Sequence, residues 1–309
     1  MSKQWTVQDI PDQNGKVVIV TGGNSGIGYE AALALAGKNA QVILTARSMD
    51  KGEAAARKIR EKYSQANVEV MQLDLADLKS VRNFVQAFLA KYKRLDILIN
   101  NAGVMAIPKR KTVDGFEMQF GTNHLGHFAL TGLLLPILKA TPNARIVTVS
   151  SGVHVSGDIH FDDLQWEKSY DRWGAYSQSK LANLLFAYEL QRQLSATGSQ
   201  LISVGCHPGY AATNLQSAGP QMDGSAFKLW MMKLANAIIA QGQDMGALPT
   251  LYAAVAADVN GCDYIGPTGM GGMRGYPAKV MSNDKSYDEA LAKRLWKVSE
   301  ELTGVVYEF

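Results

Sequence analysis

The sequence predicts an α/β protein with one doubly wound parallel β-sheet, flanked by helices on both faces. Three observations support this class. In the first half of the chain, short β-branched runs alternate with longer helical stretches, which predicts parallel pairing through right-handed crossovers. These runs lack polar–apolar alternation, as is typical of strands whose sheet is covered on both faces. No composition shift, linker or internal repeat divides the 309 residues, so we expect a single domain.

Six strands are expected, at Val17–Thr21, Val42–Thr45, Val68–Leu73, Leu95–Ile99, Ile146–Val149 and Leu201–Gly205. Helices are expected at Tyr29–Gly37, Ser48–Tyr63, Leu78–Tyr92 and Ala175–Leu194. Two segments, Gly152–Gly174 and Asn214–Gln243, are longer than minimal βα connections. Because ligands bind outside the carboxyl ends of the strands in such sheets, we interpret both segments as candidate substrate walls.

The composition argues against several classes of function. Hydrophobic residues make up 47% and charged residues 19% of the chain, as in ordinary globular proteins. The net charge of +3 comes without a run of Lys or Arg, so nucleic-acid binding is not indicated. Cys206 and Cys262 lie far apart, which indicates neither a disulfide framework nor a zinc site. A polar N-terminus and the lack of a run of about 18 apolar residues predict a cytoplasmic protein without a membrane anchor.

A glycine-rich loop, TGGNSGIG at Thr21–Gly28, follows the first expected strand and opens the first expected helix. Glycines permit a tight turn and a close approach of the backbone to a pyrophosphate, which the N–H groups of the helix start then face. The pattern is weak evidence alone, and its GxxxGxG spacing differs from GxGxxG. Its position in a βαβ unit favours a Rossmann-type dinucleotide site formed by Gly22, Asn24, Ser25, Gly26, Ile27 and Gly28.

The end of the second expected strand indicates which dinucleotide binds. An NAD enzyme typically carries an acidic residue there, which accepts a hydrogen bond from the ribose 2′-hydroxyl. This chain has Ala46 followed by Arg47, with Lys51 four residues later. A guanidinium can bind a 2′-phosphate through two hydrogen bonds, so NADP(H) is preferred and NAD(H) remains possible. The alternative is that Arg47 is only a solvated charge at a strand end.

Several motifs in fixed order extend this pattern along nearly the whole chain. They are the TGxxxGIG loop, Asp74-Leu75, Asn100-Asn101-Ala102-Gly103, Asn123, Ser151, Tyr176-xxx-Lys180 and Pro208-Gly209. On these residues the chain resembles the short-chain dehydrogenase/reductase family. Asn123–Phe128 (NHLGHF) and Tyr176–Phe186 (YSQSKLANLLF) are similar to the branch of the retinol dehydrogenases and WW-domain-containing oxidoreductases.

The resemblance implies further contacts with the cofactor. Asp74 and the Leu75 backbone would bind the adenine, and the stretch Asn101, Ala102 and Gly103 would lie along the adenosine ribose. Pro208, Gly209 and Thr213 would lie by the nicotinamide. Family members often pair through the helix that carries the Tyr/Lys motif, so a homodimer is possible, although the insertion before Tyr176 could cover that surface. One departure is Ser25, where members that prefer NADP often carry a basic residue.

The expected chemistry is hydride transfer between the nicotinamide and a small-molecule carbonyl or alcohol. Tyr176 and Lys180 stand at i and i+4 on one helix face, so the ammonium can lower the pKa of the phenol, ordinarily about 10. Tyr176 would exchange the proton. Lys180 would also reach the nicotinamide ribose. Ser151 would hydrogen-bond the substrate oxygen, although Ser150 precedes it and the sequence alone does not separate the two hydroxyls. The family implies that Asn123 holds a helix kink and a water molecule.

Four other interpretations are disfavoured by the residues. A metal site at His124 and His127 lacks carboxylate partners and an HExxH pattern, so no metal is expected. Cys206 is expected to be a buried small hydrophobe rather than a nucleophile. A non-catalytic nucleotide sensor on the same fold would not need the intact catalytic set. A light-driven protochlorophyllide reductase is disfavoured because only two cysteines and no pigment-specific signal occur.

The two long segments favour a lipophilic substrate. They contribute Val153, Phe161, Leu164, Trp166 and Trp173, and then Leu215, Met222, Phe227, Trp230, Met231 and Met232. Apolar and Met-rich walls suit an apolar ligand. The alternative is that these side chains only pack within the segments themselves. We expect residues 15–150 to bind mainly the cofactor and residues 151–309 to supply catalysis and substrate binding.

Overall fold

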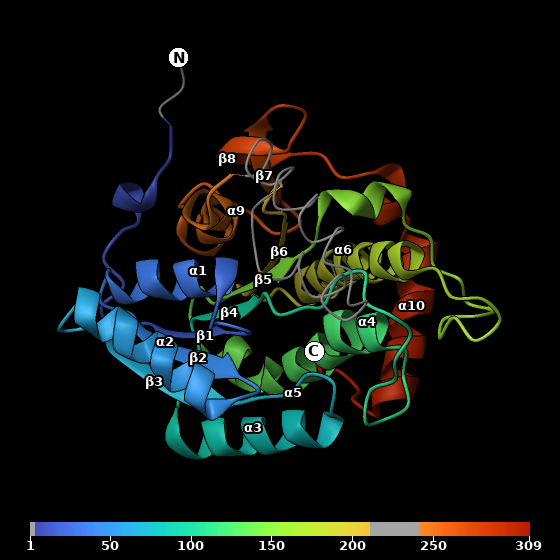
Figure 1. Cartoon of the computed structure of the whole chain (residues 1–309), viewed down its shortest axis with the longest axis horizontal. Helices are drawn as coiled ribbons and strands as arrows, with labels where there is room; N and C mark the ends of the chain where they lie inside the picture. Colours follow the sequence, from blue (N-terminus) through green and yellow to red (C-terminus); the bar gives the residue numbers. More distant parts are fainter. Residues whose placement is uncertain (1–3, 211–240) are drawn as a thin grey trace, which may run out of the picture.

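The computed structural model describes residues 4–210 and 241–309, which form one eight-stranded sheet between two helical layers (Figure 1). The strand order is β3-β2-β1-β4-β5-β6-β7-β8. Neighbouring strands pair in parallel from β3 through β7, and β8 pairs antiparallel with β7. The chain therefore has the doubly wound, Rossmann-like sheet that the sequence predicts, with an antiparallel edge strand added.

The strands are β1 (Val17–Val20), β2 (Gln41–Ala46), β3 (Asn67–Gln72), β4 (Ile97–Asn100), β5 (Arg145–Val149), β6 (Ile202–Cys206), β7 (Tyr264–Gly269) and β8 (Arg274–Val280). The α-helices described are α1 (Gly26–Ala36), α2 (Met49–Lys62), α3 (Leu78–Lys91), α4 (Met118–Phe120), α5 (Gly126–Ala140), α6 (Arg172–Ala196), α9 (Gln243–Val255) and α10 (Glu289–Thr303). Each of the six expected strands and four expected helices has a counterpart here, with bounds that differ by up to three residues.

The central strands are apolar on both sides because helices cover both sheet faces. All four residues of β1 are buried, and Val18 lies in register with Val42 of β2 and Ile97 of β4. Helices α1, α2 and α9 pack on one face through a core rich in alanine. Helices α3, α5 and α6 pack on the other face, where Phe84, Phe88 and larger aromatic groups fill the core. Figure 1 shows α1 and α9 on one side of the sheet and α3 and α5 on the other.

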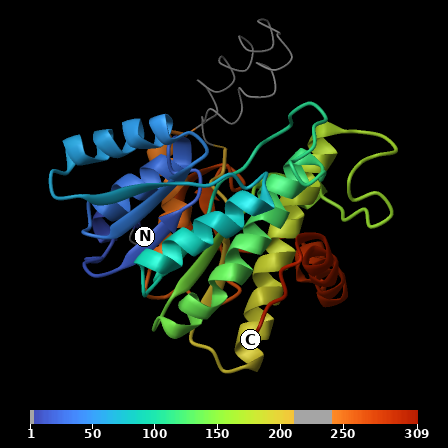
Figure 2. The ribbon, with the colours of Figure 1, turned by 90° about the horizontal axis from the view of Figure 1, so that it is seen from below.

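The C-terminal segment adds a further layer outside α5 and α6. In Figure 2, α3, α5, α6 and α10 lie in succession. Trp296 of α10 packs against Phe128 and Phe186, and the Tyr307 hydroxyl donates a 2.6 Å hydrogen bond to the carbonyl of Phe128. Gly132 permits this approach, because a Cβ there would lie 2.6 Å from the Tyr307 ring.

Helix α10 covers part of α6, the helix through which a homodimer is possible on the sequence resemblance. Leu295 of α10 belongs to one buried cluster with Leu181 and Leu185 of α6. The sequence had suggested that the insertion before Tyr176 could cover this surface. In the structure, α10 covers part of this surface of α6, because the chain returns across α6 after β8.

The hairpin of β7 and β8 was not predicted from the sequence. The backbone turns sharply between the strands, with φ positive at Met270, Gly271, Gly272 and Gly275. Three of these residues are glycines, which adopt this conformation at little cost. The hairpin places Met273 against the segment that follows β6, where the Met273 carbonyl accepts a hydrogen bond from the Tyr210 amide.

Trp296 offers a test of how much the C-terminal layer contributes to stability. Because Trp296 is 7% exposed and contacts four aromatic rings, Trp296→Ala should lower the free energy of unfolding by about 3–5 kcal/mol. Urea denaturation followed by far-UV circular dichroism measures this. Trp173→Ala is the matched control, since Trp173 is 50% exposed, and should cost less than about 1 kcal/mol. Equal losses in the two variants would contradict the packing described here.

Candidate active site

The carboxyl ends of the parallel strands bring the predicted site residues to one edge of the sheet. The segments that follow the strands carry Gly22–Gly28 after β1, Arg47 and Lys51 after β2, Asp74 and Leu75 after β3, Asn101–Gly103 after β4, Ser151 after β5, and Pro208 and Gly209 after β6. This convergence follows from parallel pairing, which aligns all the carboxyl ends. Thr213 lies outside the described residues, as do the candidate wall residues Leu215, Met222, Phe227, Trp230, Met231 and Met232.

The glycine loop has a conformation that requires glycine. Gly22 and Gly26 have φ of 63° and 60°, in the left-handed region. A Cβ on Gly28 would lie 2.4 Å from the side-chain nitrogen of Asn101, so only glycine lets these two loops meet. Ser25 is the N-cap residue of α1, yet its side chain makes no capping hydrogen bond. The first-turn N–H groups of α1 are therefore left uncapped by Ser25, in a position suited to an anion.

Thr21 connects the glycine loop to the loop that follows β4. Its hydroxyl oxygen accepts hydrogen bonds from the amides of Asn101 and Ala102, at 2.8 and 2.9 Å. The Asn101 side chain donates in return to the Thr21 carbonyl, at 2.8 Å. Thr21 is fully buried. The two loops predicted to bind the dinucleotide are thus held together by one threonine.

Arg47 lies at the end of β2 with its side chain exposed. The side-chain amide of Gln72 donates to the Arg47 carbonyl, which fixes the Arg47 backbone next to β3. Among the residues that the structure describes, the Arg47 guanidinium forms no ion pair, and neither does Lys51 in the first turn of α2. Ser48 caps that turn by accepting from the Lys51 amide. Two cationic side chains are therefore available where the sequence predicts a 2′-phosphate.

Asp74 and Leu75 form a short turn after β3. The Asp74 carboxylate accepts from the Ala76 amide at 3.0 Å, and the Asp74 amide donates to the Ser80 hydroxyl. A Cβ on Gly126 would lie 2.4 Å from the Leu75 carbonyl oxygen. The start of α5 therefore packs directly against this turn, which ties the predicted adenine site to the helix that follows Asn123.

Asn123 lies in a π-helical turn, Gly121–Leu125, which is the helix irregularity that the family resemblance implies. Its side chain holds the loop after β4, because it accepts from the Val104 amide at 2.8 Å and donates to the Val104 carbonyl at 2.9 Å. It also donates to the Ser179 hydroxyl of α6 at 2.9 Å. Both N–H groups of the side-chain amide are thereby used in joining two elements of the site, and the expected role of Asn123 with a water molecule stays a prediction.

The structure separates the two serines that the sequence left open. The Ser150 hydroxyl is buried and donates to the Lys180 carbonyl at 2.7 Å, so it serves as a tie between β5 and α6. Ser151 is only partly buried, and its side chain is close enough to the Tyr176 hydroxyl to oppose the rise in the pKa of that tyrosine. This arrangement favours Ser151 as the hydroxyl that meets a substrate.

Tyr176 and Lys180 are both buried on α6, with the Lys180 ammonium 5.7 Å from the centre of the Tyr176 ring. The sequence had suggested that Lys180 lowers the pKa of Tyr176. Instead, burial raises the pKa of Tyr176 to about 12, and the hydrogen bond with Ser151 opposes that rise. Burial also lowers the pKa of Lys180 to about 8. Lys180 does not lower the pKa of Tyr176 because its ammonium donates to the Val149 carbonyl, at 3.1 Å, and not to the phenol oxygen.

Sequence reasoning missed two histidines that contact the backbone carbonyls of candidate catalytic residues. His127 contacts the carbonyl of Asn123 through Nδ1, at 2.9 Å. His154 contacts the carbonyl of Ser151 in the same way, at 2.7 Å, while its Nε2 accepts from the Asn283 amide. The signal available in the sequence was their spacing, four and three residues after a candidate catalytic residue. His127 had been considered only as a metal ligand.

The segment after β6 is fixed by the β7–β8 hairpin. Gly209 has a φ of 66°, and a Cβ there would lie 2.4 Å from the Met273 carbonyl. The Gln241 side chain donates to the Pro208 carbonyl at 2.8 Å. Cys206, at the end of β6, is buried as expected, and burial raises the pKa of its thiol to about 12, which leaves it protonated.

The apolar residues expected to form the first substrate wall divide into two groups. Phe161 and Leu164 pack against the buried cluster between α6 and α10, and Trp166 packs against His160 and Gly174. Trp173 instead remains half exposed, with its ring 6.2 Å from that of Tyr176. Packing within the protein therefore accounts for much of this segment, and Trp173 is the member placed beside the candidate catalytic tyrosine.

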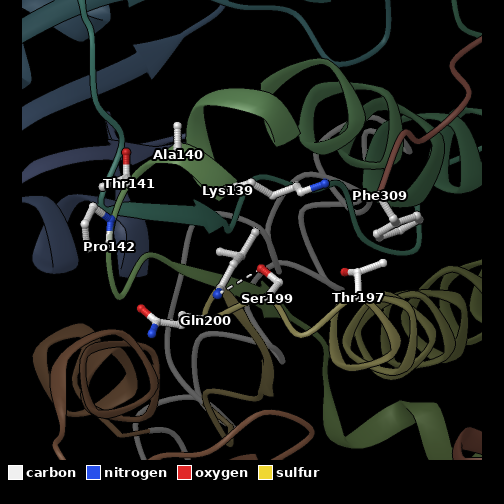
Figure 3. Close-up of a pocket in the computed structure, with 9 residues that line it drawn as sticks. Lys139, Ala140, Thr141, Pro142, Thr197, Ser199, Gln200 and Phe309 are labelled. Atoms are coloured by element: carbon white, nitrogen blue, oxygen red, sulfur yellow. Dashed lines mark hydrogen bonds between the residues drawn. The ribbon is translucent and has the colours of Figure 1, made fainter.

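A cleft of about 430 Å³ lies at the opposite edge of the sheet (Figure 3). Most of its lining residues, among them Lys139, Thr141 and Ser199, lie near the amino ends of β5 and β6. The C-terminal residue Phe309 also lines the cleft. None of the predicted site residues lines it. Within residues 4–210 and 241–309, no group of three potential metal ligands comes together, and no helix there has the length and apolarity to cross a membrane.

Comparison with known proteins identifies strong similarities over nearly the whole chain. A family model described as short chain dehydrogenase matches residues 16–223. Human retinol dehydrogenase 13 is 44% identical over 292 residues, covering 94% of this chain and 85% of that protein. Polyprenol dehydrogenase of Danio rerio is 42% identical over 313 residues, covering 98% and 91%. The crystal structure of an uncharacterized protein from Mycobacterium paratuberculosis superposes with a TM-score of 0.82 at 44% identity, covering 99% and 100%.

The buried histidines near the site predict loss of stability in acid. Burial lowers the pKa of His124 to about 3 and those of His127 and His207 to about 4, from an ordinary value of 6.5. Below pH 6.5 the unfolded chain binds protons that the folded chain excludes, so the free energy of unfolding falls as the pH drops. His124→Gln should remove about 2–3 kcal/mol of that fall between pH 7 and 4.5, measured by urea denaturation.

The control for this prediction is the wild-type protein, denatured by urea at the same pH values. If the His124 variant loses stability in acid as steeply as the wild type, His124 does not make this contribution.

Proposed function

The chain belongs to the short-chain dehydrogenase family, within its retinol dehydrogenase-like branch, and we propose that it transfers hydride between NADP(H) and a lipophilic carbonyl or alcohol. One observation carries this proposal. Ser151, Tyr176 and Lys180 come together at the sheet edge where the glycine loop lies: the Ser151 side chain acts on the pKa of Tyr176, and the Lys180 ammonium lies 5.7 Å from the centre of the Tyr176 ring. A proton donor, a polarising hydroxyl and a nearby cation are the groups that carbonyl reduction needs beside a nicotinamide.

The residues at the glycine loop fit a dinucleotide. The uncapped start of α1 would receive the pyrophosphate, because Ser25 does not occupy those N–H groups. Asp74 would bind the adenine, and Asn101 would lie along the ribose. The unpaired guanidinium of Arg47 supports NADP(H) over NAD(H), since it can meet a 2′-phosphate without breaking an existing ion pair. When bound, the nicotinamide supplies or accepts the hydride at the substrate carbon.

Side chains of the protein would deliver the proton to the substrate oxygen. With a pKa of about 12, Tyr176 keeps its proton at neutral pH and can donate it to the substrate oxygen as a carbonyl is reduced. Ser151 would donate a hydrogen bond to the same oxygen. With its pKa of about 8, Lys180 is still largely charged at pH 7 and would hydrogen-bond the nicotinamide ribose.

Exposed apolar side chains support a lipophilic substrate. Trp173 is half exposed beside Tyr176. Met270 and Met273 are 59% and 41% exposed on the turn between β7 and β8, next to the segment that carries Pro208 and Gly209. Flexible methionines adapt to apolar ligands of varied shape. The names of the similar proteins, retinol dehydrogenase and polyprenol dehydrogenase, refer to lipophilic alcohols, which supports the same class here.

Tyr176→Phe tests the proposed chemistry. Removing the hydroxyl should lower kcat for reduction of a hydrophobic aldehyde by roughly 10²–10⁴-fold, because the proton donor is lost, and should leave the Kd for NADPH within about threefold. Turnover is followed by the absorbance of the reduced nicotinamide. Tyr188→Phe is the matched control, since Tyr188 is a buried tyrosine of the same helix whose hydroxyl contacts Ser282, and it should retain turnover. An active Tyr176 variant would rule out this mechanism.

Arg47→Ala tests the choice of cofactor. Loss of a two-point contact with the 2′-phosphate should raise the Kd for NADPH by roughly 10–100-fold and leave the Kd for NADH unchanged. Titration of nicotinamide fluorescence measures both constants. Arg57→Ala provides the control, because Arg57 is an exposed arginine of the same helical region, in the middle of α2. Equal effects on NADPH and NADH would show that Arg47 does not recognise the phosphate.

A further inference from the structure

His127 lies one helical turn beyond Asn123 and bridges two parts of the site. It is 1% exposed, near the start of α5. Its Nδ1 lies 2.9 Å from the Asn123 carbonyl oxygen, and its Nε2 lies 2.9 Å from the Thr21 hydroxyl oxygen. Thr21 precedes His127 by 106 residues in sequence, so this contact is a product of the tertiary fold.

The hydrogen bonds fix which ring nitrogen of His127 carries the proton. A backbone carbonyl can only accept, so Nδ1 must donate to Asn123. Burial lowers the pKa of His127 to about 4, so at neutral pH the ring has one N–H and Nε2 is an acceptor. Thr21 then donates its hydroxyl hydrogen to Nε2. This agrees with the two amides, of Asn101 and Ala102, that already occupy the lone pairs of the Thr21 oxygen.

The result is a continuous line of hydrogen bonds from the dinucleotide loops to the catalytic helix. It runs from the loop after β4 through Thr21 and His127 to the backbone of Asn123. The Asn123 side chain continues it to the Ser179 hydroxyl, which donates at 2.7 Å to the Tyr176 carbonyl. The Thr21 hydroxyl also lies 3.2 Å from the Ile99 carbonyl oxygen, but the contact with Nε2 of His127 is shorter, at 2.9 Å, so the single hydroxyl hydrogen is assigned to Nε2.

We propose that His127 is a positioning residue, which holds the Asn123 turn and the Tyr176 helix in register with the dinucleotide loops through Thr21. The inference rests on the proposed hydride transfer and adds to it a residue that touches neither substrate nor cofactor. Its effect should appear in cofactor affinity and in kcat, because both depend on where the loops stand relative to Tyr176. The KM for the carbonyl substrate should change little.

His124 provides a matched comparison within the same stretch of chain. It is also 1% exposed, and burial likewise lowers the pKa of its ring. Its Nε2 contacts Ser299 of α10, on the side away from the cofactor loops, and it packs against Phe120 and Phe128. A role in folding alone would therefore affect both histidines, whereas the proposed role belongs to His127.

The test compares His127→Leu, His127→Gln, His124→Leu and Thr21→Val. Each full-length protein is assayed for thermal stability, for NADPH affinity by nicotinamide fluorescence, and for kcat and KM with a hydrophobic aldehyde. His127→Leu and Thr21→Val should each raise the Kd for NADPH and lower kcat by about tenfold, with KM for the aldehyde within about twofold. The double variant should lose no more affinity and kcat than Thr21→Val alone, because Thr21→Val removes the link to His127 together with the acceptor for the Asn101 and Ala102 amides.

His127→Gln should recover at least half of the lost affinity on a logarithmic scale, since its amide oxygen can accept from Thr21. His124→Leu should lose stability and keep the Kd for NADPH within twofold. If His127→Leu fails to fold, Thr21→Val carries the same test.

Two outcomes would overturn the inference. If wild-type protein binds NADPH and needs Tyr176 for turnover, yet the His127 and Thr21 variants keep wild-type affinity and kcat, the inference fails while the proposed function stands. The inference also fails, while the proposed function stands, if the changes in Kd and kcat caused by His127→Leu and Thr21→Val multiply in the double variant. If wild-type protein binds neither NADPH nor NADH, both the proposed function and this inference fail.

Discussion

The geometry of the site depends on the hydrogen bonds of the Thr21 hydroxyl. Its oxygen accepts hydrogen bonds from two backbone amides and contacts a buried imidazole. It lies where β1 ends, so it joins the glycine loop to the loop after β4 and to the start of α5. A hydroxyl suits this position because it accepts twice and donates once within a single atom. Close packing of the loops by Gly28 and Gly126 then leaves little freedom for the elements around it.

Burial governs the electrostatics of the site. Tyr176 and Lys180 are both removed from solvent, and burial shifts their pKa values in opposite directions, to about 12 and about 8. The neutral tyrosine and the easily discharged lysine each follow from the cost of an isolated charge in a poorly solvated site. The neighbouring histidines are neutral for the same reason, and a neutral imidazole can connect a donor on one side with an acceptor on the other.

The last part of the chain completes a fold whose first half already contains most of the cofactor residues. The β7–β8 hairpin fixes the backbone at Gly209, and the Asn283 amide fixes His154 beneath Ser151. Helix α10 and Tyr307 cover α5 and α6 from outside. These contacts join the carboxyl-terminal segments to the strand ends where the chemistry is proposed, so stability and site geometry are linked.

The sequence by itself determined the sheet, the order of its first six strands along the chain, and the edge at which Gly22, Ser151 and Tyr176 meet. It could do so because strand and helix periodicity are local and because parallel pairing places every carboxyl end on one side. It did not anticipate the hairpin of β7 and β8, whose turn depends on backbone conformations at Met270–Gly275 that no periodic pattern marks.

Only the tertiary structure decided which serine faces Tyr176, in which direction burial shifts the pKa of the tyrosine, and what His127 and the Asn123 side chain do. Each of these depends on atoms brought together from distant parts of the chain, as Thr21 and His127 are across 106 residues. Residue spacing can place Lys180 on the same helix face as Tyr176. It cannot show that the ammonium donates to the Val149 carbonyl instead of the phenol, because that choice depends on how the helix packs against the sheet.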